Sequence, residues 1–371
     1  ITGCDKEEVV MEMMRAMTIE RYKGGRDATR ITDVPYPKCG PKHIIIKVMA
    51  CSICKHCEKD YDNGGTGLTK PEDYPITLGH EFSGEVVEVG SAVKGIKVGD
   101  RVVTDNTVLC GECYYCKRNM PLYCENFGSM GHNIHGGFEQ YVAALGEKAF
   151  IIPDNISYEE AACTEPAACC LRALDRMQIQ YGDNIAVLGA GPMGLILAQL
   201  VKHTSANKVV VLASTQSKLD LCEREFGVKT VLVDRNDYSK HEQVIREMFP
   251  HGLNIVVDST GSADMCNSAL NMLGKGGKLV QYTQVPNFLI KDHWQFASKE
   301  LSIIMSWCQT HNFGRVVELM ENGHLNMKPL ITHEYALEDY LEALDTNLKD
   351  RNAIKVIIHP QWEKGKKIIH I

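Results

Sequence analysis

Residues 185–194 read Ile-Ala-Val-Leu-Gly-Ala-Gly-Pro-Met-Gly, and this segment sets the architecture expected for the second half of the chain. A short apolar run ends at Leu188, and a G-x-G-x-x-G motif follows it directly. From the motif onward, apolar side chains recur at the spacing of one helix face, at Met193, Ile196, Leu197, Leu200 and Val201. The segment therefore predicts a strand, a tight glycine turn and a helix, in that order.

Alternation of strand and helix continues along the chain beyond this motif. Residues 218–225 predict a helix, and apolar runs predict strands at 208–212, 230–233, 253–258 and 278–282. Strand and helix alternate in this way when parallel strands are joined by helical crossovers. We therefore predict an α/β fold that contains a Rossmann domain, a doubly wound parallel sheet.

The glycines of the motif have separate expected roles in binding a dinucleotide. Gly189 allows the tight turn, Gly191 lets a pyrophosphate approach the backbone, and Gly194 allows close contact between helix and strand. Pro192 and Met193 open the helix, whose free N–H groups and positive dipole end favour phosphates. The alternative is a plain strand-to-helix turn in another doubly wound domain.

The choice between NAD and NADP depends on the end of the second strand. An NAD site usually has an acidic residue there, which holds the ribose 2′-hydroxyl. This chain has Ala213 instead, followed by Ser214, Thr215 and, one turn later, Lys218. Without an acid to repel a 2′-phosphate, NADP is favoured over NAD; the alternative is that the hydroxyls cap the next helix and NAD binds without the acid. Thr260, after a later strand, completes the expected coenzyme-binding residues.

Four cysteines, Cys110, Cys113, Cys116 and Cys124, form a C-x2-C-x2-C-x7-C array. This spacing brings four thiolates to one tetrahedral zinc ion, and an all-sulfur site leaves no coordination position open for chemistry. We therefore predict a structural zinc. The alternative, two disulfides, fits poorly with an odd number of cysteines, 15, in a chain whose residues 1–17 suit neither a secretory nor a transit peptide.

Length and charge define the expected domain number and partners. A chain of 371 residues favours two domains. The formal net charge of -7 argues against a nucleic-acid partner, and no apolar run suggests a membrane span. We therefore expect a cytoplasmic protein that acts on a small molecule.

The first part of the chain reads as short β-strands. Apolar runs at residues 44–50, 84–90 and 100–105 are separated by Gly and Gly-Asp turns, a pattern that suggests a compact barrel. Near the C-terminus, residues 336–348 predict a helix and residues 353–358 a strand, and we expect this segment to return to the first domain. The Lys-rich end of the chain is expected to be a solvated tail.

A zinc that takes part in chemistry needs three protein ligands and one exchangeable position. The candidates are scattered along the chain, as expected for a site that folding assembles. Cys54 lies in a Cys-Ser-Ile-Cys-Lys-His-Cys segment, His80 in Gly-His-Glu-Phe-Ser-Gly, and Glu165 in Cys-Thr-Glu-Pro. Glu165 stands where the two sequence patterns join, and a cleft is expected at such a junction.

These elements, together and in this order, resemble the zinc-dependent medium-chain dehydrogenases, in particular the alcohol and polyol (sorbitol-like) dehydrogenases. The resemblance covers nearly the whole chain, from Ile53-Cys54 through the four-cysteine array and the glycine motif to Asp258-Ser-Thr-Gly261. It implies a GroES-like catalytic domain over residues 1–168, a Rossmann domain over 169–306, and a C-terminal segment, 307–371, that completes the catalytic domain. It also implies a homodimer or homotetramer.

The resemblance implies a ligand set for the catalytic zinc. Cys54 and His80 would be ligands, Glu165 the third ligand or its close neighbour, and Glu81 an alternative or transient fourth ligand. Cysteines compete with Glu165 for the third position, because related alcohol dehydrogenases have a cysteine ligand there. The competitors are Cys163, Cys169 and Cys170.

The chain departs from the family after the first ligand, where it has Lys55-His56-Cys57 in place of Gly-Ser/Thr-Asp. His56 replaces the hydroxyl that begins a proton relay, and it could accept the alcohol proton itself. Cys57 replaces the acid that orients the ligating histidine, and a thiol is a weaker partner for that purpose.

The resemblance implies reversible hydride transfer between NADP(H) and a secondary alcohol, a polyol or sugar alcohol, and its ketone. Two alternatives stay open. One is an NAD-dependent threonine-type or other hydroxy or amino acid dehydrogenase. The other is a nucleotide-sensing binding protein on a dehydrogenase scaffold.

Overall fold

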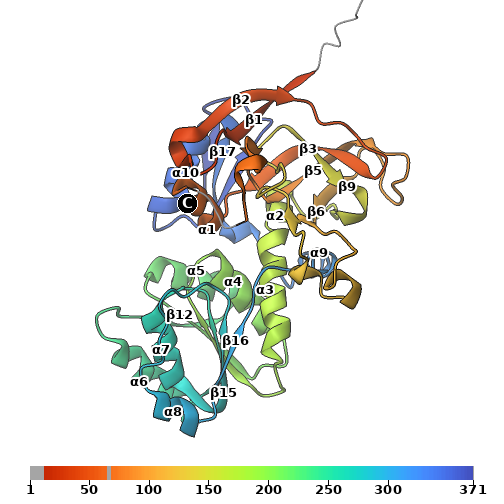
Figure 1. Ribbon diagram of the computed structural model, residues 1–371. Helices are drawn as coiled ribbons and strands as arrows, with labels where there is room; N and C mark the ends of the chain where they lie inside the picture. The colour runs from red at the N-terminus through yellow and green to blue at the C-terminus, as the bar shows by residue number, and fades with distance from the viewer. Residues whose placement is uncertain (1–11, 65–67, 371) are drawn as a thin grey trace, which may run out of the picture.

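The computed structural model describes residues 12–64 and 68–370, so the expectations for residues 1–11 lie outside the described part of the chain. Figure 1 shows two parts, one above the other: a sheet-rich part that contains the first and last described residues, and a part built around a parallel sheet. Helix α3 (Thr164–Met177) runs between them.

The lower part in Figure 1 is the predicted Rossmann domain. Its strands are β11 (Asn184–Leu188), β12 (Lys208–Ala213), β13 (Lys229–Leu232), β14 (Leu253–Asp258), β15 (Leu273–Gln281) and β16 (Ser302–Met305). They are parallel and follow the order β13-β12-β11-β14-β15-β16. Counted along the chain, this is the order 3-2-1-4-5-6, whose reversal beside β11 forms the crevice where dinucleotides bind.

Helices cover both faces of this sheet. They are α4 (Pro192–Lys202), α5 (Gln216–Phe226), α6 (Tyr238–Met248), α7 (Ala263–Met272) and α8 (His293–Ser298). Side chains of β11 alternate between the two faces: Ile185 and Val187 pack into a core with α3 and α4, and Ala186 and Leu188 into a second core with α6 and α7. All four are fully buried, as expected for a parallel strand covered on both faces.

The upper part is the predicted GroES-like domain. Its largest sheet contains β3 (His43–Ser52), β5 (Glu81–Val89), β6 (Arg101–Thr104), β9 (Tyr141–Leu145), β10 (Ala149–Ile151), β17 (Ile331–Ala336), β18 (Lys355–His359) and β19 (Lys367–Ile369). Strand β3 is central, because it pairs with β5, β9 and β18. Smaller sheets are formed by β1 (Met13–Ile19), β2 (Thr29–Pro35) and β4 (Ile76–Thr77), and by β7 (Thr107–Val108) and β8 (Gly128–Ser129).

The C-terminal segment enters this sheet through β18, where Ile357 lies opposite Ser52 of β3. Helix α10 (Tyr340–Lys349) precedes β18, close to the predicted helix. The predicted division of the chain at residues 168 and 306 stays a prediction.

The Lys-rich end is exposed, as expected, but residues 367–369 are not a loose tail, because they form β19 antiparallel to β17. Glu334 of β17 helps to hold the end of the chain against the sheet. One of its carboxylate oxygens contacts His359 and the other contacts His370, each at 2.6 Å. The residue after β19 is thereby held against the sheet.

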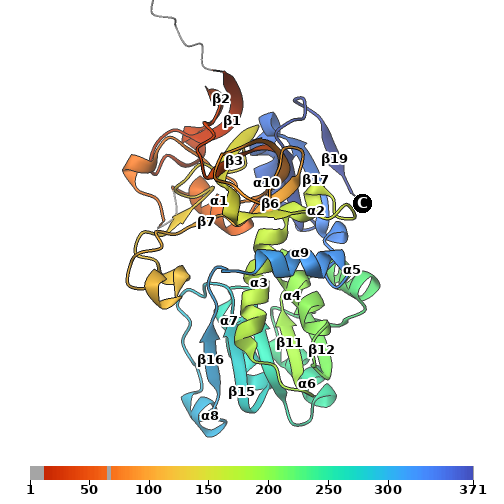
Figure 2. The same cartoon turned by 90° about the vertical axis from the view of Figure 1, so that its right-hand side faces the viewer.

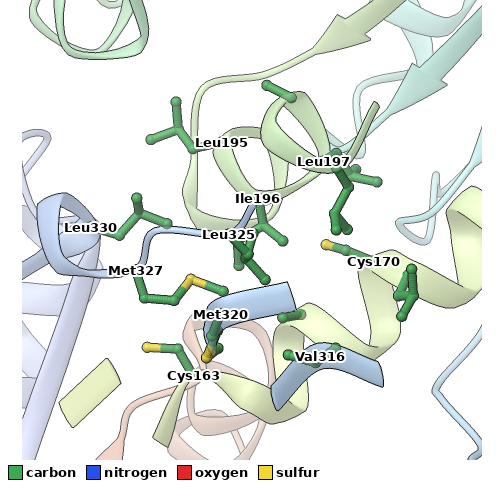
Figure 3. Close-up of a cluster of buried hydrophobic side chains, with 14 of the residues drawn as sticks. Cys163, Cys170, Leu195, Ile196, Leu197, Val316, Met320, Leu325, Met327 and Leu330 are labelled. Atoms are coloured by element: carbon green, nitrogen blue, oxygen red, sulfur yellow. The ribbon is translucent and has the colours of Figure 1, made fainter. Parts of the chain in front are cut away.

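A single hydrophobic core joins α3 and α4 to α9 (Phe313–Glu321), which lies across them in Figure 2. Figure 3 shows Val316 and Met320 of α9 packed among residues of α4 and beside Cys163 and Cys170. Met327 belongs to the same core and comes from the chain that leads to β17. Among the described helices, none has the length and apolar character that a membrane crossing requires.

Replacing Gly194 with alanine is expected to destabilise the protein, whereas replacing Gly191 is not. A Cβ at Gly194 would lie 1.9 Å from the carbonyl oxygen of Gly189, but a Cβ at Gly191 would meet no atom within 4 Å. We expect Gly194→Ala to cost about 1–3 kcal/mol of unfolding free energy, as overpacking does, and Gly191→Ala almost none. Denaturant unfolding followed by circular dichroism measures both. Equal stability of the two variants would contradict this packing role.

Candidate metal and coenzyme sites

The candidate ligands of the catalytic metal converge where β3, β5 and α3 meet. Near the end of β3, Ser52 lies opposite Glu81 at the start of β5. This register brings Cys54, just beyond β3, close to His80, just before β5. Cys54 also caps the N-terminus of α1 (Lys55–Asp62), and Glu165 lies in the first turn of α3. Strand register and two helix N-termini therefore assemble the site.

Two groups of ligand atoms form around His80. The sulfurs of Cys54 and Cys57 and a ring nitrogen of His80 lie within 4.8 Å of one another. A ring nitrogen of His80 and carboxylate oxygens of Glu81 and Glu165 form a second group with the same limit. The structure thus brings together the four predicted residues and adds Cys57.

These residues fit a catalytic zinc. His80 is 4% exposed and its Nδ1 has no hydrogen-bond partner, which is costly for a buried polar atom unless another group binds there. Thiolate, imidazole and carboxylate are the donors that zinc takes from proteins, and a catalytic site uses three of them. Cys54, His80 and a third side chain of these groups would hold the ion.

Burial and hydrogen bonds shift the pKa values of the cluster. Burial raises the pKa of Glu165 to about 7, and the thiol of Cys169 donates to its Oε1 at 3.3 Å. The pKa of Cys54 lies well below its usual value, because the Cys57 side chain hydrogen-bonds to it and His80 is close, and these effects outweigh burial. Of the two thiols, that of Cys54 therefore ionises more readily than that of Cys57, whose pKa its hydrogen bond with Cys54 raises well above the usual value.

Glu81, the expected alternative fourth ligand, belongs to a buried ion pair. Its Oε2 accepts a hydrogen bond from Nζ of Lys355 in β18. The same ammonium group donates to the carbonyl of Ile53 at 3.4 Å. Both charged side chains are almost fully buried. Glu81 therefore faces His80 with its charge already compensated.

His56 lies on the outer side of α1. Its side chain is 63% exposed, and its Nε2 lies 3.7 Å from a carboxylate oxygen of Asp60. The structure does not bring His56 into either group around His80, and its role as a proton acceptor stays a prediction.

The three cysteines that compete with Glu165 lie outside both groups. Cys163 and Cys170 donate to backbone carbonyls, at 3.6 and 3.5 Å. Cys169 donates to Glu165 itself. Glu165 is thus the side chain of this segment that faces His80.

Two side chains border the metal groups and were missed by sequence reasoning. The ring of His132 packs against that of His80 at a tilt of 35°, with centroids 4.3 Å apart, and burial lowers the pKa of His132 to about 3. Glu58 in α1 is 1% exposed, its Oε2 has no hydrogen-bond partner, and burial raises its pKa well above the usual value. Neither residue belongs to a motif, so no pattern in the sequence marks them.

The four-cysteine array folds into one group of sulfurs that all lie within 4.8 Å. The Sγ of Cys110 lies 3.5 Å from that of Cys124 and 4.0 Å from that of Cys116. Backbone N–H groups, including that of Cys113 at 3.4 Å, point at Cys110 and lower its pKa to about 6. The described cysteines are free thiols. This geometry fits a structural zinc with four thiolate ligands.

The glycine turn lies at the carboxyl end of β11. Gly189 has a φ of +103°, and a Cβ there would lie 2.7 Å from Oγ of Ser259, so only glycine fits. Thr260 borders the same turn, and its hydroxyl donates to the buried carboxylate of Asp258 at 2.6 Å. Its hydrogen bond to Asp258 thus holds Thr260 beside the glycine turn.

Helix α4 begins directly after this turn. Gly191 is its N-cap residue and Pro192 its first residue. Met193, also in the first turn, accepts the Cys170 thiol on its carbonyl oxygen, which ties α4 to α3. The free N–H groups of this turn form the expected phosphate site.

Arg235, a cation that sequence reasoning missed, lies beside the end of β12. Arg235 Nε donates to Oγ of Ser214 at 2.9 Å. Thr215 is the N-cap residue of α5, but its hydroxyl makes no capping hydrogen bond to this helix. Lys218 Nζ donates to the carbonyl of Ala353 at 3.1 Å, which links the coenzyme domain to the C-terminal segment. Arg235 follows the third strand of the sheet, where no motif marks it.

Comparisons with known proteins agree with this geometry. Residues 40–154 match the model of the alcohol dehydrogenase GroES-like domain, and residues 192–322 match that of the zinc-binding dehydrogenases. D-arabinitol dehydrogenase 1 of Uromyces fabae is 33% identical over 348 residues, which cover 93% of this chain and 97% of the relative. L-threonine 3-dehydrogenase of Pseudoalteromonas translucida (strain TAC 125) is 30% identical, over 90% of this chain and 96% of the relative.

Among solved structures, a protein from Sinorhizobium meliloti 1021 bound to NADP superposes with a TM-score of 0.82 and 28% identity, over 94% of this chain and 100% of that one. The chain therefore belongs to the zinc-binding medium-chain dehydrogenase family. Within it, the chain is an enzyme of the alcohol and polyol dehydrogenase type. This result argues against the alternative of a nucleotide-sensing protein without chemistry.

Removing one thiolate from the four-cysteine lobe is expected to release its metal. We expect Cys113→Ser to lose about one zinc per chain and to expose residues 111–123 to limited proteolysis, because a lobe of short turns depends on its metal for order. Cys39→Ser is the control, since its thiol only donates to backbone carbonyls, including that of His43 at 3.3 Å, and serine can do the same. Unchanged zinc content in Cys113→Ser would argue against the site.

Proposed function

We propose that the protein is a zinc-dependent oxidoreductase that transfers hydride reversibly between NADP(H) and a secondary alcohol, a polyol or sugar alcohol, and its ketone. The observation that carries the proposal is the position of the metal group at the carboxyl end of the parallel sheet. Helix α3 supports this position, because its first turn carries Glu165 and its Cys170 thiol donates to the carbonyl of Met193, in the first turn of α4 beyond β11. The metal ligands therefore face the crevice in which a dinucleotide binds.

When bound, zinc acts as a Lewis acid on the substrate oxygen and the nicotinamide ring exchanges the hydride. The chain supplies position and charge. Cys54 and His80 would hold the metal beyond the end of β3, and Lys355 balances the charge of Glu81, the carboxylate directly after His80. Glu165 can hold or release a proton at its carboxylate near neutral pH, because burial brings its pKa to about 7.

The preference for NADP is supported by the cations around the end of β12. Ala213 leaves no carboxylate to repel a 2′-phosphate, and Arg235 already contacts the hydroxyl of Ser214. Lys55 at the start of α1 lowers the pKa of Lys218 by like-charge repulsion, in addition to the larger effect of burial. The positive charge that both lysines contribute to this region favours a strongly anionic coenzyme.

A polyol substrate is supported by the arabinitol relative, and a hydroxy amino acid by the threonine relative. The amino acid reading needs a free cation for the substrate carboxylate. Lys355, the buried cation beside His80, is already paired with Glu81. We therefore favour the polyol, and a screen of sugar alcohols against L-threonine with each coenzyme separates the two readings.

The cytoplasmic location stays a prediction, as does the homodimer or homotetramer. One observation favours assembly through the coenzyme domain. Strand β16 is one of the two edges of the parallel sheet, β13 being the other, and Met305 of β16 is 52% exposed. An unpaired apolar edge is suited to pairing with a second copy.

Removing the catalytic metal is expected to abolish turnover. A chelator that extracts the more weakly bound zinc should lower NADP(H)-linked oxidation of polyols by at least about 100-fold, because the Lewis acid supplies several kcal/mol of charge stabilisation. Added zinc should restore activity. Turnover is followed at the nicotinamide absorbance, with zinc content measured in parallel. Unchanged turnover in protein that has lost this zinc would exclude the mechanism.

Arg235→Ala is expected to weaken binding of NADPH by about tenfold or more and to leave binding of NADH unchanged, because hydrogen bonds to charged groups contribute about 1.5–3 kcal/mol. Arg224 offers a matched control: it is an exposed arginine of α5 that pairs with its neighbour Glu225 at 2.7 Å. Fluorescence titration with both coenzymes measures the effect. Equal losses for NADPH and NADH would count against a 2′-phosphate site.

A further inference from the structure

Cys57 stands where related dehydrogenases have an acid that orients the ligating histidine, yet its surroundings do not match that role. Among the described residues, no hydrogen bond joins the Cys57 side chain to the ring of His80. The Sγ of Cys57 instead lies 3.4 Å from Nε2 of His132 and hydrogen-bonds with the side chain of Cys54. Cys57 is therefore available for a different function.

The hydrogen bonds around His132 bear on which of its ring nitrogens can donate to Cys57. Asn106 donates its amide N–H to Oγ of Ser129 at 3.2 Å, so the hydroxyl hydrogen of Ser129 is free to point at Nδ1 of His132, 3.0 Å away. In the tautomer in which Nδ1 accepts this hydrogen, Nε2 carries the ring hydrogen and can donate it to the sulfur of Cys57. N–H donors of this kind stabilise a thiolate.

We propose that Cys57 is the third protein ligand of the catalytic zinc, so that Cys54, Cys57 and His80 hold the ion and Glu165 stands beside its exchangeable position. This inference rests on the proposed function, because it concerns the same metal. It places a ligand at a position where the family has an orienting acid.

The grouping of the side chains supports this ligand set. The sulfurs of Cys54 and Cys57 form one group with His80, whereas Glu165 groups with His80 and Glu81. Cys54 and Cys57 are also spaced as C-x2-C, which is the spacing of successive ligands in the array that begins at Cys110. Two cysteines and one histidine are a known ligand set of catalytic zinc, with the fourth position left to water or substrate.

The charges lead to the same assignment. Thiolates at Cys54 and Cys57 together cancel the double charge of zinc. A further bond to Glu165 would make the site negative and close it, which a site that binds a substrate oxygen must avoid. Both cysteines lie at the N-terminal end of α1, Cys54 as its N-cap, where the helix dipole favours negative charge. Glu165 is then left free to exchange a proton beside the open position.

Cobalt(II) in place of the catalytic zinc tests the inference, with zinc retained in the four-cysteine lobe and one of each metal verified by analysis. Charge-transfer absorption from thiolate to cobalt in the near ultraviolet reports the number of bound thiolates. We expect Cys57→Ser to lose about half of this absorption, as much as the reference variant Cys54→Ser. Cys39→Ser, whose sulfur lies outside both groups, should lose none.

Metal competition with a chromophoric chelator provides a second readout. Cys57→Ser should hold the catalytic metal at least about tenfold more weakly, and Glu165→Gln should stay within about threefold of the wild type. Full absorption and affinity in Cys57→Ser, together with weak binding in Glu165→Gln, would overturn the inference in favour of Glu165.

The wild-type protein separates the possible failures, even where a variant does not fold. X-ray absorption at the cobalt edge counts the sulfur ligands directly: two sulfurs support the inference and one overturns it. One sulfur with intact activity overturns the role of Cys57 alone. Failure of the wild type to bind any metal beside Cys54 overturns the proposed function as well.

Discussion

A buried ion pair constrains the catalytic cleft more than any other interaction. Glu81 lies directly after His80 and is almost completely removed from water, as is its partner Lys355. An unpaired charge in such a place costs several kcal/mol, so the carboxylate stays beside the metal group only if a cation reaches it. That cation comes from β18, 274 positions further along the chain. The charge balance of the metal site therefore depends on the pairing of β18 with β3. If β18 left the sheet, Glu81 would lose its partner or become exposed.

Helix α3 connects this charge balance to the coenzyme. Its first turn carries Glu165 into the metal group, while its later residues pack into the core with α4 and α9 (Figure 3). Cys170 of α3 bonds to the carbonyl of Met193 in the first turn of α4, at the expected phosphate site. A rigid helix thus sets the separation between the metal group and the glycine turn, as hydride transfer over a short fixed distance requires.

Much of this arrangement could be predicted from periodicity and motif spacing, and the exceptions have physical reasons. The segment around Gly189 predicts its strand, turn and helix because parallel strands are apolar on both faces. Strand β17 was missed because polar residues, among them His333 and Glu334, interrupt its apolar pattern and are buried by pairing. The motifs name Cys54, His80 and Glu165, but Arg235 and His132 enter the sites from loops. Their positions depend on tertiary contacts that leave no periodic trace.

Position 57 illustrates how one substitution changes what its surroundings must provide. An aspartate there would add a permanent negative charge beside the Cys54 thiolate and the buried carboxyl of Glu58, whose pKa burial already raises. A cysteine can be a neutral thiol without metal and a thiolate with it, so the site avoids that repulsion when empty. The orienting bond that aspartate would give His80 is lost, and the ring of His132, packed at a tilt against that of His80, contacts it instead. The charge at position 57 therefore depends on the metal, whereas an aspartate there would carry a fixed charge.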